Sequence, residues 1–373
     1  MDGLILALNA GSSSLKCALF EAAGTSQAAI ARSLIETSGR AEAVIPEVMA
    51  WCAKVAAGRD VTAVGHRVVH GGAQFQAPVR IDDDVLRDLE ALTPLAPLHQ
   101  PQSLALIRAV EKGLPGCPQI ACFDTAFHAG QADVAIRFGL PDDLHRLGVR
   151  RYGFHGLSYE YVVGRLAELD PELAAGRVVV AHLGSGASLC AVQAGRSVDT
   201  TMGFSPLDGL VMSTRPGALD PGAVLYLLQH RGLTADQVQD LLYHRSGLLG
   251  VSGISGDMRV LLASDAAAAR RAVDLFVYRI GREAGSLASS LGGLDGVVFT
   301  AGIGEHSAEI RKRVGQRLAW LGLRLNEGVD DAGGPRRIGS SGSKVAAWVI
   351  PTDEEQVIAR HVRQVMGLRP TAP

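Results

Sequence analysis

The chain has 373 residues, of which 47% are hydrophobic, and its 36 basic and 38 acidic side chains give a formal net charge of −2. This composition is that of a folded soluble protein, and the near-neutral charge argues against nucleic acid as the main partner, since duplex binding relies on a basic face. The five scattered cysteines predict reduced thiols and a cytoplasmic location. No apolar run in the sequence is long enough for a membrane span, and Leu4–Leu8 is too short for a signal peptide.

Two strand–turn–strand patterns are predicted, one near the start of the chain and one near its middle. Each has two short apolar runs around a polar turn, at 4–8 and 15–20, and again at 177–182 and 189–192. The turns are similar, Gly11-Ser-Ser-Ser-Leu15 against Gly184-Ser-Gly-Ala-Ser-Leu189. The second pattern begins about 170 residues after the first, which predicts a duplicated domain rather than a solenoid, whose repeats span 20–50 residues.

Elsewhere, helical patterns alternate with short strand-like runs, which is typical of an α/β protein. Asp82 or Asp83 is expected to cap a helix over 84–92. Ser158 or a neighbouring residue is expected to cap a second helix over 158–169. The other expected helices are 102–112, 223–231, 234–243, 265–291, one from Ser307, and 354–366. The other expected strands are 119–123, 297–300 and 345–350, and a domain boundary is expected near residue 148.

Several polar clusters directly follow the expected strands, and in open α/β sheets ligands bind beyond the carboxyl ends of strands. In the first half, Asn9 could reach a metal or its water, and Lys16 a phosphate. Taken singly, each of these residues also fits an ordinary turn or a satisfied polar side chain. The other polar residues in such clusters are Arg67, His66, His70, His99, Asp124 and His155. No spacing of His or Cys indicates a zinc site.

In the second half, the clusters are rich in glycine, a residue that lets backbone N–H groups approach an anion closely. Ala301-Gly-Ile-Gly-Glu305 is expected at a strand-to-helix turn, where a helix N-terminus favours phosphate. Arg215 lies in a loop of turn residues that fits a functional site or a surface loop equally well. The dinucleotide and P-loop patterns are both absent from the sequence, which disfavours a Rossmann dehydrogenase and a P-loop kinase.

Together these segments resemble the acetate, propionate and butyrate kinase family. The matching runs occur in the order that the family has and span residues 9 to about 360: Asn9–Lys16, Gly65–Gly72, Ala96–His99, Phe123–His128, Tyr152–Gly156, Ser197–Thr200, Met202–Phe204, Gly302–Glu305 and Glu354–Glu355. The resemblance implies duplicated α/β domains of the actin-like ATPase (ribonuclease H-like) fold with a central nucleotide cleft. It implies one domain of residues 1–148 and 355–373, and a second, nucleotide-binding domain of residues 149–354.

The resemblance also implies the activity. The family transfers the γ-phosphate of ATP reversibly to acetate, giving acetyl phosphate and ADP by direct in-line transfer, with Mg²⁺ or Mn²⁺. Two alternatives stay open, namely a propionate or butyrate kinase and an actin-like ATPase that is not a kinase. The resemblance implies a homodimer with acetate or another short carboxylate and ATP as ligands.

Roles for individual residues follow from the positions that match the family. The implied catalytic residues are Asp124, His155, Arg215 and Arg67. The implied acyl pocket consists of Arg67, Val69, Leu98, Phe154 and Pro206. The implied nucleotide contacts are Lys16, His182, Leu183, Gly184, Ser185, Gly186, Asp257, Met258, Arg259, Ala301, Gly302, Ile303, Gly304 and Glu305. The implied metal-site residues are Asn9 and Glu354.

Asp124 needs a separate interpretation, because a carboxylate substrate has a pKa near ~4.3 and is already ionised at pH 7. We therefore expect Asp124 to orient Arg67 or the waters of the metal rather than to remove a proton. The chain departs from the family at Ser185, where Asn is usual, and at Leu157 and Tyr159, where Thr and His are usual. These changes are expected to alter phosphate affinity and rate. The acyl pocket predicts acetate as substrate, yet one methylene is worth only about 1–3 kcal/mol, so propionate is expected to react too.

Overall fold

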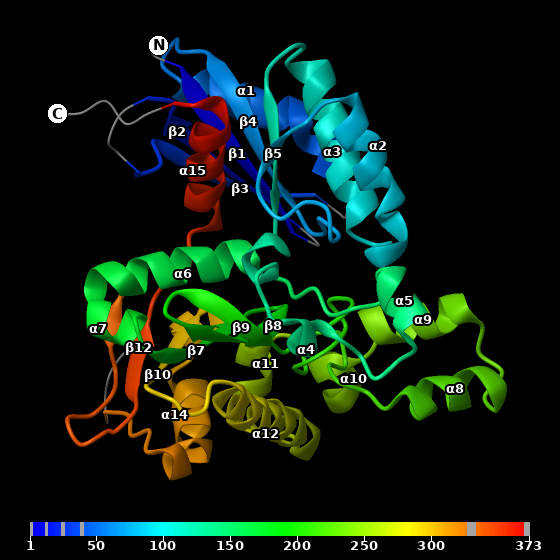
Figure 1. The fold of residues 1–373 in the computed structure, drawn as a ribbon, viewed down its shortest axis with the longest axis vertical. Coiled ribbons are helices and arrows are strands. Elements are labelled where there is room, and N and C mark those ends of the chain that lie inside the picture. The colour runs from blue at the N-terminus through cyan, green and yellow to red at the C-terminus, as the bar shows by residue number, and fades with distance from the viewer. Residues whose placement is uncertain (1–2, 12–13, 24–26, 38–40, 327–332, 369–373) are drawn as a thin grey trace. The chain divides into compact units, whose positions relative to one another are not determined.

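The computed structural model describes residues 3–11, 14–23, 27–37, 41–326 and 333–368, and its ribbon is drawn in Figure 1. The chain forms two compact units. Unit 1 consists of Met1–Ala129, Phe154–Tyr161 and Asp353–Pro373, and unit 2 of Gly130–Gly153 and Val162–Thr352. The domain ranges expected from the sequence, which divide the chain at 148 and 354, stay a prediction.

Unit 1 is built on a six-stranded mixed sheet with the strand order β3-β2-β1-β4-β6-β5. Its strands are β1 (Leu4–Ala10), β2 (Ser14–Glu21), β3 (Ala31–Glu36), β4 (Val61–Val68), β5 (Val79–Arg80) and β6 (Gln119–Phe123). β1, β2 and β3 pair antiparallel, whereas β4 is parallel to both β1 and β6, and β5 is an antiparallel edge strand. The carboxyl ends of β1, β4 and β6 therefore meet at one edge of the sheet.

Unit 2 repeats this sheet strand for strand, in the order β9-β8-β7-β10-β12-β11. Its strands are β7 (Arg177–Leu183), β8 (Ala187–Gln193), β9 (Arg196–Thr200), β10 (Gly296–Thr300), β11 (Arg336–Arg337) and β12 (Ala346–Val349). The pairings have the same directions, with β7, β10 and β12 parallel to one another and the remaining pairs antiparallel. This equivalence confirms the α/β class and the duplication expected from the two hairpins.

Helices cover both faces of the sheet of unit 1. Leu4, Leu6 and Leu8 of β1 pack in a core with α1 and α3, and Ile5 and Ala7 pack on the opposite face with α15. β1 is thus buried on both sides, which is why its sequence is a continuous apolar run rather than an alternating one. The helices of this unit are η1 (Ala41–Val44), α1 (Ile45–Val55), α2 (Asp83–Ala91), η2 (Thr93–Leu95), α3 (Gln100–Gly113), η3 (Ala126–His128) and α15 (Glu354–Met366).

The helices of unit 2 include the longest of the described chain, α12 (Ala267–Ser290), which packs against β8 and β9. α6 (Gly156–Leu169) begins in unit 1 and continues into unit 2. The others are α4 (Asp133–Ile136), α5 (Asp142–Arg146), α7 (Pro171–Ala174), α8 (Pro221–Gln229), α9 (Ala235–His244), α10 (Gly247–Ser252), α11 (Met258–Leu262), α13 (Ala301–His306), α14 (Ala308–Arg317) and η4 (Ala319–Leu321). Within the described residues, no helix combines the length and apolar character needed to cross a membrane.

Two local predictions were wrong. Ser158 does not cap α6, because the helix already begins at Gly156 and Ser158 is buried inside its first turn. The segment Ala301–Glu305, expected as a turn, forms a short helix of its own, and Ser307 then caps α14 by accepting a hydrogen bond from the backbone N–H of Ile310. By contrast, Asp82 caps α2 as expected, by accepting a hydrogen bond from the N–H of Val85 at 2.8 Å.

A close approach between β4 and α15 gives a stability prediction. A Cβ atom added to Gly65 would lie 2.4 Å from Cγ2 of Ile358 and 2.7 Å from Cγ2 of Val362. We expect Gly65→Ala to lower the free energy of unfolding by about 1–3 kcal/mol, the usual cost of overpacking. Gly164→Ala is the control, since a Cβ there meets nothing within 4 Å on a helix and should stabilise by about 0.5–1 kcal/mol. Urea midpoints measure both, and equal midpoints for the two variants would contradict the packing argument.

Candidate functional site

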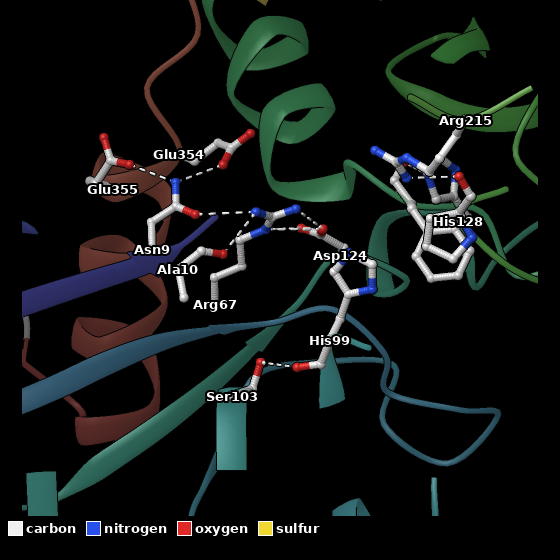
Figure 2. Close-up of polar contacts among 12 residues, drawn as sticks. Asn9, Ala10, Arg67, His99, Ser103, Asp124, His128, Arg215, Glu354 and Glu355 are labelled. Carbon is white, nitrogen blue, oxygen red and sulfur yellow. Dashed lines mark hydrogen bonds and ion pairs between the residues drawn. The ribbon is translucent and has the colours of Figure 1, made fainter. Parts of the chain in front are cut away.

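Three polar side chains of unit 1 meet where neighbouring parallel strands end. Asn9 is near the end of β1, Arg67 near the end of β4, and Asp124 directly follows β6. These strands are adjacent in the sheet, so their carboxyl ends place the three side chains side by side, as Figure 2 shows. The expectation that polar clusters gather beyond the strand ends holds for these residues of unit 1.

Arg67 and Asp124 form an ion pair with several contacts. Nε of Arg67 donates to Oδ1 and Oδ2 of Asp124 at 3.2 and 3.0 Å, and Nη2 donates to Oδ2 at 2.6 Å. The side chain of Asp124 is 1% exposed and that of Arg67 16%. Burial raises the pKa of Asp124, and the Arg67 charge opposes that rise. Burial by itself would lower the pKa of Arg67, but the neighbouring carboxylates raise it, so the guanidinium stays protonated.

The remaining nitrogen of the guanidinium connects this pair to Asn9. Nη1 of Arg67 donates to Oδ1 of Asn9 at 3.3 Å and to the carbonyl of Ala10 at 3.4 Å. Nδ2 of Asn9 in turn donates to Oε2 of Glu354 at 2.8 Å and to Oε1 of Glu355 at 2.6 Å. One hydrogen-bonded network therefore runs from the end of β6 to the first turn of α15 (Figure 2).

The donor set at the start of α15 suits a hard divalent cation. Asn9 and the two glutamates offer only oxygen ligands, and all three are buried. Mg²⁺ commonly takes one or two carboxylates and completes its shell with waters and phosphates. Among the described residues, no group of three or more His, Cys, Asp or Glu side chains could hold a metal.

Glu355 and Arg32 belong to this network, although the sequence analysis assigned no role to either. Arg32 forms ion pairs with Glu355, at 3.1 Å between Nη1 and Oε2, and with Asp353. Burial raises the pKa of Glu355, and its hydrogen bond with Asn9 opposes the rise. The two consecutive glutamates at the expected start of the last helix could have indicated a role for Glu355. Nothing in the sequence indicated a role for Arg32, because its strand, β3, was not predicted.

The turn from Phe154 to Gly156 packs against Asp124. The N–H of Gly156 donates to the carbonyl of Asp124 at 2.9 Å, and a Cβ on Gly156 would lie 2.2 Å from that oxygen. His155 adds a backbone hydrogen bond to the Asp124 carboxylate. His155 has a φ of 61°, in the left-handed region, which costs a non-glycine residue about 1–3 kcal/mol. This strained backbone sets His155 directly against the ion pair.

Among the apolar candidates of unit 1, Phe154 has contacts with two histidines. Its ring is buried and meets the ring of His70 edge-on at 5.5 Å, and its carbonyl accepts a hydrogen bond from Nε2 of His128 at 3.0 Å. Burial lowers the pKa of His128 to about 4, so the ring is neutral at pH 7. Val69 is also buried, and Leu98 is half-buried.

In unit 2, the Arg215 loop is tied to the second hairpin. The N–H of Ser213 donates to the carbonyl of Ser185, and Nη1 of Arg215 donates to the carbonyl of Pro206 at 2.8 Å. Gly247 has a φ of 63°, and a Cβ there would lie 2.3 Å from the carbonyl of Met212. Only glycine therefore lets α10 begin so close to the loop, and the position of Arg215 depends on that contact.

The expected nucleotide contacts lie mainly in unit 2. Gly184, Ser185 and Gly186 form the bend of the hairpin, whereas His182 and Leu183 are buried in β7. Asp257 caps α11 and pairs with Arg259, while Met258 is buried. Ala301, Gly302, Ile303, Gly304 and Glu305 make up most of α13, and Ala301 has a φ of 63°.

Lys16, the remaining nucleotide candidate, is exposed on β2 opposite Asn9. Ser12 and Ser13, of the same motif, lie outside the described residues. The structure thus gathers the candidates into one group in unit 1 and further groups in unit 2. The roles assigned to them stay predictions.

The chain was compared with known proteins. The family model described as the acetokinase family matches residues 49–360. The acetate kinase of Rhodopseudomonas palustris is 52% identical over 390 residues, which cover 97% of this chain and 98% of the relative. The acetate kinase of Rhizobium meliloti is 48% identical over 387 residues, with the same coverage.

Solved structures of acetate and propionate kinases are also similar to this chain over nearly its full length. The crystal structure of Porphyromonas gingivalis acetate kinase has a TM-score of 0.85 and 34% identity, covering 98% of this chain and all of that one. A propionate kinase from Francisella tularensis has a TM-score of 0.87 and 34% identity, covering 96% of this chain and 98% of its own. The expected actin-like ATPase fold with two domains is thereby confirmed. Because the family match and these relatives extend over most of its length, the chain belongs to the acetokinase family.

Proposed function

We propose that the chain transfers the γ-phosphate of ATP to acetate, giving acetyl phosphate and ADP in a reversible reaction. The observation that carries this proposal is the protonated, half-buried Arg67, held by the buried Asp124, in a chain with nearly full-length likeness to acetate kinases. Nε and Nη2 of Arg67 hold Asp124, and the second N–H of Nη2 is a charge-assisted donor for a substrate carboxylate. An actin-like ATPase without a carboxylate substrate has no evident use for such a group.

Asp124 acts in this proposal as a positioning residue. Both of its carboxylate oxygens accept from Arg67, and acetate needs no base because it is already ionised at pH 7. Phosphoryl transfer passes through a loose transition state with charge on three equatorial oxygens, so catalysis depends mainly on positioning and charge stabilisation. We assign that stabilisation to Arg215 and His155. An arginine in this role is worth about 10³–10⁵ in rate.

Asn9 and Glu354 would hold a magnesium ion together with waters and phosphate oxygens, with manganese as the substitute. When bound, the ion supplies charge neutralisation of the phosphates. The oxygen-only donor set and the burial of both residues support this assignment. Glu355 is held by Asn9 and Arg32, so it keeps Asn9 in place rather than serving as a ligand.

Acetate is the proposed physiological acid. Phe154 and Val69 are buried and bulky, which supports a pocket with room for a methyl group. The structure of a propionate kinase is as similar to this chain as that of an acetate kinase, so the fold alone does not separate the two substrates. Since one methylene is worth about 1–3 kcal/mol, we expect propionate to react more slowly than acetate rather than not at all.

Trapping of the acyl phosphate tests the function directly. With ATP, Mg²⁺ and hydroxylamine, the chain should form a hydroxamate from acetate, and a smaller amount from propionate, because only an acyl phosphate is attacked readily. The control omits the acid. A higher kcat/KM for butyrate than for acetate would contradict the assignment of acetate, and no hydroxamate from any of the three acids would contradict the kinase itself.

Asp124→Asn tests the positioning role. The amide cannot hold Arg67 as an ion pair, and a lost hydrogen bond to a charged group is worth about 1.5–3 kcal/mol. We expect kcat/KM for acetate to fall by about 10- to 100-fold, with KM for acetate rising. Asp124→Glu, which keeps the charge, should lose less. Asp84→Asn, in an exposed pair with Arg87, is the control and should change nothing measurable.

The same kinetics separate a positioning role from a base. If Asp124 removed a proton, kcat would fall while KM for acetate stayed constant, and Asp124→Glu would give no rescue. Thermal unfolding of each variant is measured in parallel, because leaving Arg67 buried without its partner costs stability as well. Normal kcat and KM in a folded Asp124→Asn variant would rule out both roles.

We further propose that the chain is a homodimer in which α8 packs on its equivalent in the second copy. This helix has the sequence Pro-Gly-Ala-Val-Leu-Tyr-Leu-Leu-Gln, without a charge, and none of its nine residues is buried. Leu225 and Tyr226 are 51% and 53% exposed. Contiguous exposed apolar side chains mark interaction surfaces. An uncharged face also packs on its own copy without like-charge repulsion, as a two-fold interface requires.

Leu225→Glu tests this interface, because it brings two carboxylates together across the two-fold axis. We expect the mass in solution, measured by light scattering, to fall from twice 39.1 kDa to 39.1 kDa. Leu140→Glu is the control, since Leu140 is 50% exposed in the same unit but lies outside α8. A dimer that persists in Leu225→Glu, or a monomeric unmodified chain, would contradict the proposal.

A further inference from the structure

The loop that carries Arg215 has two arms. It runs through residues 201–220, between β9 and α8, in neither a helix nor a strand. Ser205 and Pro206 belong to the first arm, and Thr214 and Arg215 to the second. Nη1 of Arg215 donates to the carbonyl of Pro206 at 2.8 Å, so the guanidinium bridges the two arms. Its direction therefore depends on how the arms are held relative to each other.

The second arm is joined to the end of α9. Oγ1 of Thr214 donates to the carbonyl of Tyr243 at 2.7 Å, and the N–H of Ser246 donates to the carbonyl of Thr214 at 2.9 Å. A further hydrogen bond, from the N–H of Met212 to the carbonyl of Arg215 at 3.0 Å, closes the turn that carries the arginine. The backbone beside Arg215 is therefore fixed to the helix.

The first arm is anchored where it leaves β9. Nη2 of Arg151 donates to the carbonyl of Thr200 at 2.7 Å, and Nη1 forms an ion pair with Asp208 at 3.2 Å. Within the arm, the hydroxyl of Ser205 accepts from the N–H of Leu207 at 3.3 Å. These contacts shape the first arm, but they do not set its distance from the second.

Tyr243 contacts both arms. Its carbonyl accepts from Thr214 of the second arm, and its hydroxyl shares a hydrogen bond with the hydroxyl of Ser205 in the first. The residue is only 7% exposed, and a buried tyrosine hydroxyl usually has a hydrogen-bond partner. Here that partner is the neighbour of Pro206, whose carbonyl accepts from Arg215. Tyr243 therefore connects the two ends of the bridge that the guanidinium makes.

The phenol of Tyr243 is a neutral group beside the arginine. Burial raises the pKa of Tyr243 by more than the Ser205 hydrogen bond and the Arg215 charge lower it. The hydroxyl is therefore protonated at pH 7, since the ordinary pKa of a tyrosine is about 10. A neutral group orients a guanidinium without cancelling its charge. A transition state with charge on three equatorial oxygens is stabilised best by a donor that keeps its full charge.

We propose that Tyr243 is a positioning residue for Arg215. The hydrogen bond between Tyr243 and Ser205 sets the separation of the two arms, and with it the place of the Pro206 carbonyl to which the guanidinium donates. Tyr243 acts through Arg215 and not on the substrate. This role rests on the proposed function of Arg215 in phosphoryl transfer, and it adds a residue that the sequence did not single out.

Tyr243→Phe tests the role, because it removes the hydroxyl and keeps the ring. We expect kcat to fall about three- to tenfold, the worth of one hydrogen bond, with KM for acetate and for ATP unchanged. An interaction that is made only in the transition state lowers kcat without raising KM when it is lost. Tyr278→Phe is the matched control, since Tyr278 is 47% exposed on α12 and its hydroxyl should be dispensable.

Ser205→Ala removes the same hydrogen bond from the other side. We expect the same fall in kcat, and the double variant with Tyr243→Phe should lose no more than either single variant, because both changes remove one bond. In an Arg215→Ala background, Tyr243→Phe should cause no further loss, whereas a general loss of packing would lower the residual rate there as well. Thermal unfolding of each variant checks that it is folded at the assay temperature.

Hydroxamate formation by the unmodified chain, measured first, separates this role from the proposed function. If hydroxamate forms, then a normal kcat in Tyr243→Phe, additive losses in the double variant, or a further loss in the Arg215→Ala background would each overturn the role of Tyr243 alone. If hydroxamate forms from none of the three acids, the proposed function fails, and the role of Tyr243 fails with it.

Discussion

The organisation of unit 1 depends on the ion pair between Arg67 and Asp124. Asp124 is almost inaccessible to water, and removing one partner of such a buried pair costs about 3–5 kcal/mol because the other charge remains. The pair needs β4 and β6 to be parallel neighbours, the turn at Gly156 to lie against Asp124, and Asn9 to reach the guanidinium from β1. The buried pair therefore depends on the sheet order, the turn and the reach of Asn9 together.

The two units use the same sheet in different ways. At the strand ends of unit 1, charged side chains interact with one another. In unit 2, the corresponding region relies on glycine-rich backbone, in the hairpin bend at Gly184–Gly186 and in α13 after β10. Such segments offer N–H groups rather than charges to a ligand. The high glycine content, 44 of 373 residues, is in part a result of this arrangement.

Much of the fold was predictable from sequence, because its long elements have clear apolar patterns. β6 and α15 have the predicted bounds, and the paired hairpins revealed the duplication. The short strands β3, β5, β9 and β11 were not predicted, since they are pinned by sheet pairing rather than by a pattern of their own, and the helix α1 was missed as well. α13 was missed because glycine disfavours helix, a preference that its tertiary setting overrides. Arg67 and Asp124 were recognisable candidates, but their mutual geometry depends on strand order, which no local pattern contains.

The two-residue strands that close one edge of each sheet, β5 and β11, have a consequence for behaviour in concentrated solution. An exposed edge strand invites pairing with a strand from another molecule, and very short edge strands are one way in which proteins prevent this. On the opposite edge of unit 1, β3 carries Arg32, whose charge further discourages a neighbour. The two-residue edges β5 and β11, and the charge of Arg32 on β3, thus give intermolecular β-pairing little to extend and protect the chain against aggregation by strand addition.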